Sequence, residues 1–175
     1  MKKLKNSELL ENAMAAFLYA ASDLEYYDED GTAHKKLPWV VKGDRFCAYT
    51  DEDDCDSVFF YVDYCLNELF YNIGTKEFRK NFVDRCPKAR GFANITLSLL
   101  HELGHLETTW YDFGDYDRDA EYAKILTLPT NQINHEYFKL PDEYAATEWA
   151  IEWLSKKENR IVAKQFERAF FACFA

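Results

Sequence analysis

The sequence predicts an α+β fold that is dominated by helices and has a small antiparallel sheet before an apolar helix at residues 92–108. Apolar residues recur at helical spacing near both ends of the chain and through its middle. Residues 39–63 break this pattern, because they are rich in β-branched and aromatic side chains. The length of 175 residues suffices for one hydrophobic core but not for two ordinary domains, so we predict a single domain over residues 1–175.

The helices follow from apolar periodicity together with residues that begin or end a helix. Ser7 or Asn6 can cap the first helix. Thr75 can cap another, and Pro87 ends it. Residues 92–108 have a strong apolar stripe. The predicted helices cover residues 7–23, 65–71, 75–86, 92–108, 120–128, 142–156 and 158–174.

Strands are predicted at residues 39–41, 45–49 and 57–63, separated by Gly43 and by the acidic stretch 51–56. A small antiparallel sheet is the simplest interpretation of three such short neighbours. Polar residues, Gly and Pro instead predict loops or irregular structure in three further stretches, which are residues 26–38, 109–119 and 129–140.

Charge and cysteine content argue against several classes of protein. The net charge is −10 and the longest basic cluster is residues 1–5, so no basic face for direct nucleic-acid binding is expected. The five cysteines include no CxxC pair, which argues against a disulfide framework and a thiolate zinc site. No apolar run reaches the roughly 18 residues of a membrane span, and polar residues 6–12 interrupt a signal-like start. We therefore predict a cytoplasmic protein.

The segment HELGH gives the helix at residues 92–108 its chemistry. His101 and His105 are four residues apart, so their rings project from one helix face about one turn apart. That spacing lets two imidazole nitrogens lie about 2.0–2.1 Å from one Zn²⁺. Glu102 follows the first histidine, where its carboxylate can accept the proton of a zinc-bound water whose pKa the metal lowers to about 7. We predict His101 and His105 as zinc ligands and Glu102 as the general base.

The neighbourhood of this motif supports a site but leaves an ordinary alternative. Gly104 carries no side chain, which would let a strand or a substrate backbone approach the second histidine closely. The alternative is that both histidines are structural residues of an amphipathic helix. The apolar stripe around them favours the metal site, since the motif lies on a helix rather than in a loop.

The sequence leaves the third protein ligand open. A metzincin needs Gly at position 108 and His at position 111, but Thr108 and Tyr111 stand there. A gluzincin takes a glutamate from a second helix, for which Glu143 and Glu148 are candidates, and His135 would complete a three-histidine site. Glu143 shares its predicted helix face with mostly small residues that permit close packing, whereas Glu148 shares its face with residues that favour solvent. Glu143 is therefore the preferred third ligand.

HELGH followed by a helix that reads Pro-Asp-Glu-x-x-Ala-Thr-x-Trp-Ala resembles the ImmA/IrrE-type metallopeptidases of bacterial chromosomes, phages and integrative elements. The resemblance covers residues 92–154, and the family's usual glutamate position falls on Ala145, two residues from Glu143. It implies a gluzincin with a compact zincin-like helical domain and zinc held by the two histidines and a glutamate. It also implies site-specific cleavage of a repressor-like protein partner.

Two weaker features lie outside the motif. A calcium loop would need Gly and Glu where Ala120 and Leu126 stand, so the acidic stretch before them is predicted as a solvated loop that could select basic substrates. Its acidic residues are Asp112, Asp115, Asp117 and Asp119. A peptidase also benefits from a donor that stabilises the oxyanion, and the candidates are Tyr111, Tyr116, His135 and Tyr137.

These residues together predict a zinc metallopeptidase that hydrolyses a peptide bond in a protein or peptide substrate. One alternative is a catalytically silent zinc-containing module that regulates or binds another protein. Another is a non-peptide amidohydrolase, which would need a closed polar pocket. A zinc site with an open fourth position favours an enzyme, and a closed four-ligand site favours the silent module.

Overall fold

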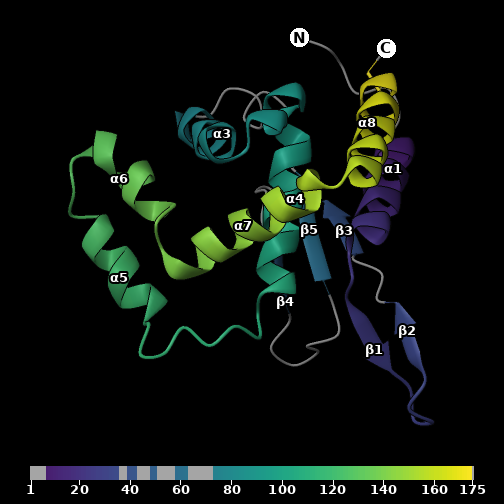
Figure 1. The fold of residues 1–175 in the computed structure, drawn as a ribbon, viewed down its shortest axis with the longest axis horizontal. Helices are drawn as coiled ribbons and strands as arrows, with labels where there is room; N and C mark the ends of the chain where they lie inside the picture. Colours follow the sequence, from purple (N-terminus) through teal and green to yellow (C-terminus); the bar gives the residue numbers. More distant parts are fainter. Residues whose placement is uncertain (1–6, 36–38, 43–47, 51–57, 63–72, 175) are drawn as a thin grey trace.

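The computed structural model describes residues 7–35, 39–42, 48–50, 58–62 and 73–174 (Figure 1). Its helices are α1 (Ser7–Ala21), α3 (Ile73–Arg85), the short 3-10 helix η1 (Pro87–Gly91), α4 (Asn94–Glu107), α5 (Arg118–Ile125), α6 (Thr130–Tyr137), α7 (Pro141–Ser155) and α8 (Lys157–Ala172). Its strands are β1 (Glu25–Tyr27), β2 (Ala33–Lys35), β3 (Trp39–Lys42), β4 (Ala48–Thr50) and β5 (Val58–Val62). Helices dominate, and a small sheet precedes α4, which carries HELGH, so the predicted α+β class is confirmed at this level.

The three predicted strands form one sheet, but its pairing is mixed. Its order is β3-β5-β4, with β5 antiparallel to β4 and parallel to β3. The prediction of a purely antiparallel sheet is therefore wrong for the β3–β5 pair. The reason is topological: β5 inserts between its two predecessors, which run in opposite directions, so it must be parallel to one of them.

An antiparallel hairpin, β1–β2, lies where residues 26–38 were predicted to be a loop. The Asp28 side chain accepts hydrogen bonds from the backbone N–H groups of Asp30 and Thr32, and Gly31 takes a positive φ of 77° in the turn. All residues of both three-residue strands are exposed. Strands that bury neither face show no alternation of polar and apolar residues, so this stretch has no strand signal in its sequence.

The helix predictions hold for most of the chain and fail in one place. Residues 129–140, predicted as irregular, contain α6, none of whose residues is buried. A helix without a buried face has no apolar stripe to reveal it. The helix predicted at residues 65–71 lies outside the described residues. Within the described part of the chain, no helix has both the length and the apolarity needed to cross a membrane.

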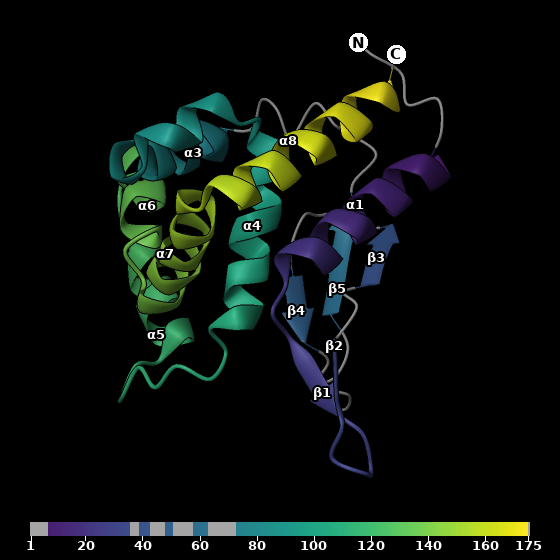
Figure 2. The same cartoon turned by 45° about the vertical axis from the view of Figure 1, so that its right-hand side comes forward.

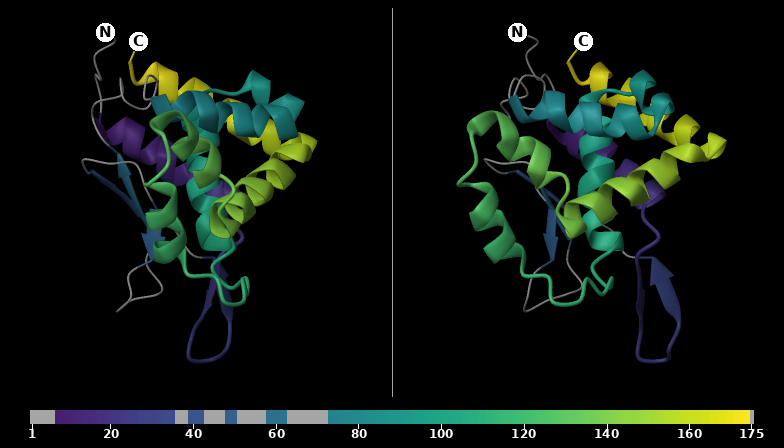
Figure 3. Two further views of the ribbon diagram at one scale, coloured as in Figure 1. Left: turned by 90° about the vertical axis from the view of Figure 1, so that its left-hand side faces the viewer. Right: turned by 60° about the vertical axis from the view of Figure 1, so that its left-hand side comes forward.

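The helix α4 runs through the middle of the molecule, with α7 crossing it (Figure 1). On one side of α4, α1 lies against the three-stranded sheet and α8 packs along α1 (Figure 2). On the other side lie α3, α5 and α6, with α5 and α6 beside the beginning of α7 (Figure 3). The apolar face of α4 supplies much of the core, with Ile95, Leu97, Leu99, Leu100, Leu103 and Leu106 buried. A central buried helix can hold the side chains of its remaining face in fixed positions.

Close contact between α4 and α7 depends on Gly104. A Cβ atom at this position would lie 2.4 Å from the carbonyl oxygen of Ala146 and 2.9 Å from the Ala146 Cα. Only glycine permits this approach, because backbone atoms in a helix cannot move aside as a flexible side chain can. The sequence led us to expect a strand or a substrate backbone beside Gly104, and the structure places helix α7 there instead. This contact brings the first turn of α7 to the histidines of α4.

Candidate metal centre

Two histidines on one face of α4 begin the candidate metal centre. The ring centroids of His101 and His105 are 4.7 Å apart. His101 is 4% exposed and makes edge contacts with three aromatic rings, those of Phe78, Phe82 and Phe138. His105 lies nearer the surface, with 22% of its side chain exposed. The aromatic packing fixes the ring of His101, while His105 keeps one side open to solvent.

Glu143, in the first turn of α7, is the third member of the group. Its carboxylate oxygen Oε2 lies 2.9 Å from Nε2 of His101 and 3.5 Å from Nε2 of His105. The ligand atoms of the three residues lie within 4.8 Å of one another, so the group could hold a metal ion. The structure thus brings together the three ligands that the sequence predicted. Glu143 lies on a buried face of α7, with its side chain 1% exposed, and shares it with Ala146, Thr147, Ala150 and Leu154.

The two other candidates for the third ligand lie elsewhere. Glu148 is on the exposed face of α7 and forms an ion pair with Arg85 of α3. His135 is on α6, with 65% of its side chain exposed, and its Nε2 lies 4.0 Å from the carboxylate of Glu136. Neither residue joins the group of His101, His105 and Glu143.

The hydroxyl of Thr147 determines which nitrogen of His101 carries a proton. This hydroxyl donates to the backbone carbonyl of Glu143 at 2.9 Å, since a carbonyl can only accept. Its oxygen therefore accepts from Nδ1 of His101, 3.2 Å away. With Nδ1 engaged in this way, Nε2 is the nitrogen that faces Glu143 and could bind a metal ion. A metal-binding histidine usually has such a partner on its second nitrogen.

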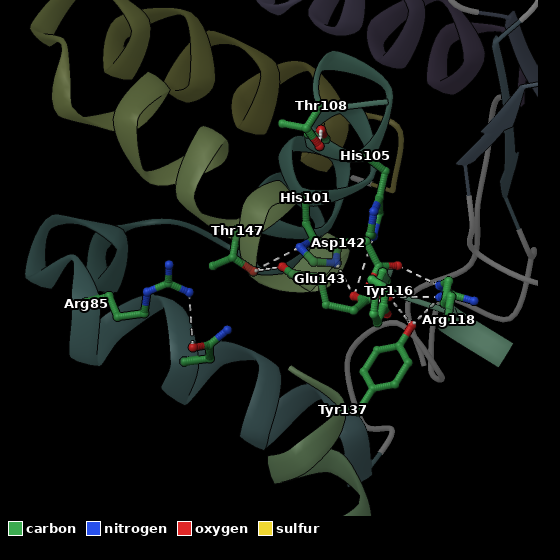
Figure 4. A network of polar contacts seen from close by, with 12 residues as sticks. Arg85, His101, His105, Thr108, Tyr116, Arg118, Tyr137, Asp142, Glu143 and Thr147 are labelled. Carbon is green, nitrogen blue, oxygen red and sulfur yellow. Dashed lines mark hydrogen bonds and ion pairs between the residues drawn. The ribbon is translucent and has the colours of Figure 1, made fainter. Parts of the chain in front are cut away.

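The second oxygen of the Glu143 carboxylate has its own partners (Figure 4). Oε1 accepts hydrogen bonds from the hydroxyl of Tyr137 and from the guanidinium of Arg118, the latter at 3.1 Å. Arg118 also donates through Nε to Asp142 at 2.6 Å, and the Tyr116 hydroxyl donates to the other oxygen of Asp142 at 2.7 Å. These residues come from α5, α6 and the loop before α5, so three segments converge on the first turn of α7.

The charges of the centre favour a cation. Burial raises the pKa of the Glu143 carboxyl, but hydrogen bonds and charges of His101 and His105 outweigh it and hold that pKa well below its usual range. Burial lowers the pKa of His105, yet Glu143, aided by the charge of Glu102, raises it above its ordinary value. Burial and the Glu143 charge both raise the pKa of Tyr137, so its hydroxyl keeps its proton and remains a donor.

The donor set fits a zinc ion. With its Nδ1–H directed at the Thr147 hydroxyl oxygen, His101 turns Nε2 toward a carboxylate oxygen 2.9 Å away. Two acceptors this close repel each other unless a positive charge lies between them, and a proton or a metal ion can supply it. Two imidazoles and one carboxylate are a ligand set of catalytic zinc sites. Other divalent transition metals also bind imidazole, so the set suits zinc or a similar ion.

Glu102 lies beside the group without belonging to it. It is half-buried on α4, and its charge contributes to the raised pKa values of both His105 and Tyr137. The carboxylate is therefore within electrostatic range of the open side of the centre, where His105 is partly exposed. A base in that place can reach a water molecule that approaches from solvent.

The remaining predicted residues fall into two groups. The four aspartates of the 112–119 stretch are exposed, as expected for a solvated loop, and two have local structural roles. Asp112 accepts from the backbone N–H of Gly114, and Asp117 caps α5 by accepting from that of Ala120. Of the proposed oxyanion donors, Tyr137 and Tyr116 instead hydrogen-bond to carboxylates of α7, and Tyr111 and His135 are exposed.

The sequence did not indicate that Arg118, Thr147 and Tyr137 support the ligands. Thr147 has a local signal: four residues after Glu143, it lies one helical turn away on the same face. Arg118 and Tyr137 have none, because they approach Glu143 from other segments across 25 and 6 residues of sequence.

Comparisons with models of protein families, with curated proteins and with solved structures find no match to this chain. The function must therefore be argued from the geometry of the site.

Proposed function

We propose that this chain is a zinc-dependent metallopeptidase of the gluzincin kind, similar to the ImmA/IrrE type, that cleaves a peptide bond in a protein substrate. The observation that carries the proposal is the buried group of His101, His105 and Glu143, whose ligand atoms lie within 4.8 Å of one another. Two histidines and a glutamate leave the fourth position of a catalytic zinc open to water or substrate. A zincin-like fold and a repressor-like substrate belong to the same proposal.

Each residue of the site has a defined role in this proposal. Bound zinc would supply Lewis acidity, which lowers the pKa of a water molecule and polarises the carbonyl under attack. Thr147 keeps Nε2 of His101 available as a ligand by accepting a hydrogen bond from Nδ1–H. Glu102 accepts the proton that the attacking water loses and returns it to the leaving amine.

The exposure of the group favours an enzyme over a silent zinc-containing module. The His101 and Glu143 side chains are buried, whereas His105 is partly open to solvent. The group found among the described residues has three members, and a structural zinc site normally has four protein ligands. A substrate carbonyl can therefore approach on the His105 side, next to Glu102.

The replacement Glu102→Gln tests the proposal. This variant should retain zinc, because Glu102 is not one of the ligands, and it should lose hydrolysis of a fluorescence-quenched peptide library by roughly 100-fold or more, the contribution of a general base. Glu148→Gln is the matched control on an exposed surface and should cleave like wild type. Unchanged cleavage by Glu102→Gln would sink the assignment. Wild-type protein that keeps zinc but cleaves nothing would favour the silent module.

A further inference from the structure

The two oxygens of the Glu143 carboxylate are held by different kinds of partner. Oε2 faces the Nε2 atoms of both histidines, at 2.9 Å and 3.5 Å. Oε1 faces away from them and accepts from the guanidinium of Arg118 and the hydroxyl of Tyr137. Figure 4 shows the carboxylate between these two sets of partners. One oxygen is therefore available to a metal ion and the other is already engaged.

Arg118 is itself held in place by a neighbouring carboxylate. Its Nε donates to Asp142 at 2.6 Å while its Nη2 donates to Glu143 at 3.1 Å, so one guanidinium spans two consecutive residues of α7. The same Nη2 lies 3.3 Å from the Tyr137 hydroxyl oxygen. The planar fork of arginine suits such a shared arrangement, because its donors point in fixed directions.

The ion pair of Arg118 with Glu143 differs from an ordinary surface salt bridge in the burial of one partner. The Arg118 side chain is 49% exposed, but the Glu143 side chain is 1% exposed. Water screens exposed pairs, which are worth little, but it cannot replace Arg118 as a partner of a buried carboxylate. Arg118 is also a poor receptor for a substrate carboxylate, since two carboxylates of the protein already bind it.

We propose that Arg118, with Tyr137, is a positioning residue of the metal centre that holds Oε1 of Glu143 and so presents Oε2 alone to the metal. This proposal rests on the zinc site proposed above. The last torsion of a glutamate side chain is broad, so a carboxylate without such partners can rotate and offer either oxygen or both. Partners of this kind around metal ligands are worth about 10–100-fold in metal affinity.

The sign of the effect distinguishes positioning from simple charge. Arg118 is a cation near the metal, so its charge alone opposes zinc binding, and removing it would strengthen binding. Loss of positioning does the reverse. We therefore expect Arg118→Gln to bind zinc about 10–100-fold more weakly than wild type. Arg118→Lys should also bind more weakly, because one ammonium group lacks the fork that reaches both carboxylates.

The experiment measures zinc affinity by competition with a chelating dye for the full chain and its Arg118→Gln, Arg118→Lys and Tyr137→Phe variants. Arg85→Gln is the matched control, since it removes the other arginine–glutamate pair of α7. The melting temperature of each metal-free variant reports a merely structural role, and the visible absorption of bound Co²⁺ reports the coordination of the metal. We expect weaker zinc binding and a changed Co²⁺ spectrum in the Arg118 and Tyr137 variants, with Arg85→Gln like wild type.

Three results would overturn the inference. Arg118→Gln could bind zinc as tightly as wild type or more tightly, or Arg85→Gln could lose as much affinity. A drop in metal-free melting temperature large enough to explain the loss of affinity, in both Arg118 variants, would show a structural role instead. Wild-type protein that fails to bind zinc would remove the proposed function as well, whereas the three results above leave that function intact.

Discussion

Glu143 and Glu148 lie on the same helix, α7, and each forms an ion pair with an arginine from another helix. Glu143 pairs with Arg118 of α5, and Glu148 pairs with Arg85 of α3. The side chain of Glu143 is 1% exposed and that of Glu148 is 51% exposed. The two positions therefore have the same kind of charge partner and differ in how far the carboxylate is removed from water.

This difference decides what each carboxylate can do. Water solvates Glu148, and its exposed pair contributes about 0–1 kcal/mol to stability. Water cannot solvate Glu143, so the protein must supply every partner of that charge. It supplies two histidines on one oxygen and two donors on the other. Burial against α4 thus makes one of two similar glutamates a metal-ligand candidate.

The largest expected effect comes from removing the charge of each glutamate in turn. Glu143→Gln keeps the shape of the side chain but loses the anionic ligand, so zinc affinity should fall by roughly 100-fold or more. This loss exceeds the one expected for a residue that only hydrogen-bonds to a metal ligand. Glu148→Gln should change that affinity less than about twofold. Competition with a chelating dye measures both, and circular dichroism verifies the fold. Equal losses would remove the distinction between the two faces of α7.

The contact that buries Glu143 can be broken at Gly104. Alanine in place of a helical glycine normally stabilises a helix by about 0.5–1 kcal/mol. Here the new Cβ would lie 2.4 Å from the Ala146 carbonyl oxygen, so α7 must shift, and overpacking of this kind costs about 1–3 kcal/mol. Urea unfolding of Gly104→Ala measures the loss. Gly91→Ala, where the added Cβ meets nothing within 4 Å, is the control and should be nearly neutral.

A smaller effect is expected at Thr147, which lies on the same buried face of α7 as Glu143 and hydrogen-bonds to His101. Thr147→Val removes the hydroxyl but keeps the shape, so Nδ1 of His101 loses its acceptor. Zinc affinity should fall about tenfold, the lower end for a partner of a metal-binding histidine. Thr147→Ser retains the hydroxyl and should restore most of the affinity. If valine and serine behave alike, the hydroxyl does not orient His101.

The smallest effect concerns Glu107, whose carboxylate is half-buried and so is intermediate in burial between Glu143 and Glu148. It is the last residue of α4 and accepts from the Ser22 hydroxyl at 3.0 Å and the Asp23 backbone N–H at 2.8 Å. Burial raises its pKa above the ordinary value of 4.5 despite these bonds. The folded state therefore binds this proton more tightly, so its contribution to stability is lost as the pH rises through the raised pKa.

Glu107→Gln should consequently be more stable than wild type at pH 7. The advantage should stay below about 1 kcal/mol, a size typical of removing a negative charge from a helix C-terminus. It should shrink as the pH falls toward about 3, well below the ordinary glutamate pKa, because the carboxyl is then protonated in both states. Urea unfolding at the two pH values measures this. An advantage of the same size at both would show that the charge of Glu107 is not its source.

The strength of local signals explains how much of the fold was predictable. Helices α4 and α7 bury one face, so their apolar periodicity identified them from sequence. No residue of the α6 helix is fully buried and every residue of the β1 and β2 strands is exposed, and both elements were missed. The parallel pairing of β3 with β5 was also missed, because strand order depends on contacts between segments distant in sequence.

The sequence by itself determined the chemistry that one helix can present. Spacing of four residues puts His101 and His105 on one face and Glu102 beside them, because helix geometry is the same wherever the helix lies. It also ranked Glu143 above Glu148, from the small residues that share its face. Only the tertiary structure brought the Glu143 carboxylate to the histidines and supplied Arg118 and Tyr137 to its second oxygen. That step depends on how α4, α5, α6 and α7 pack, which local spacing does not encode.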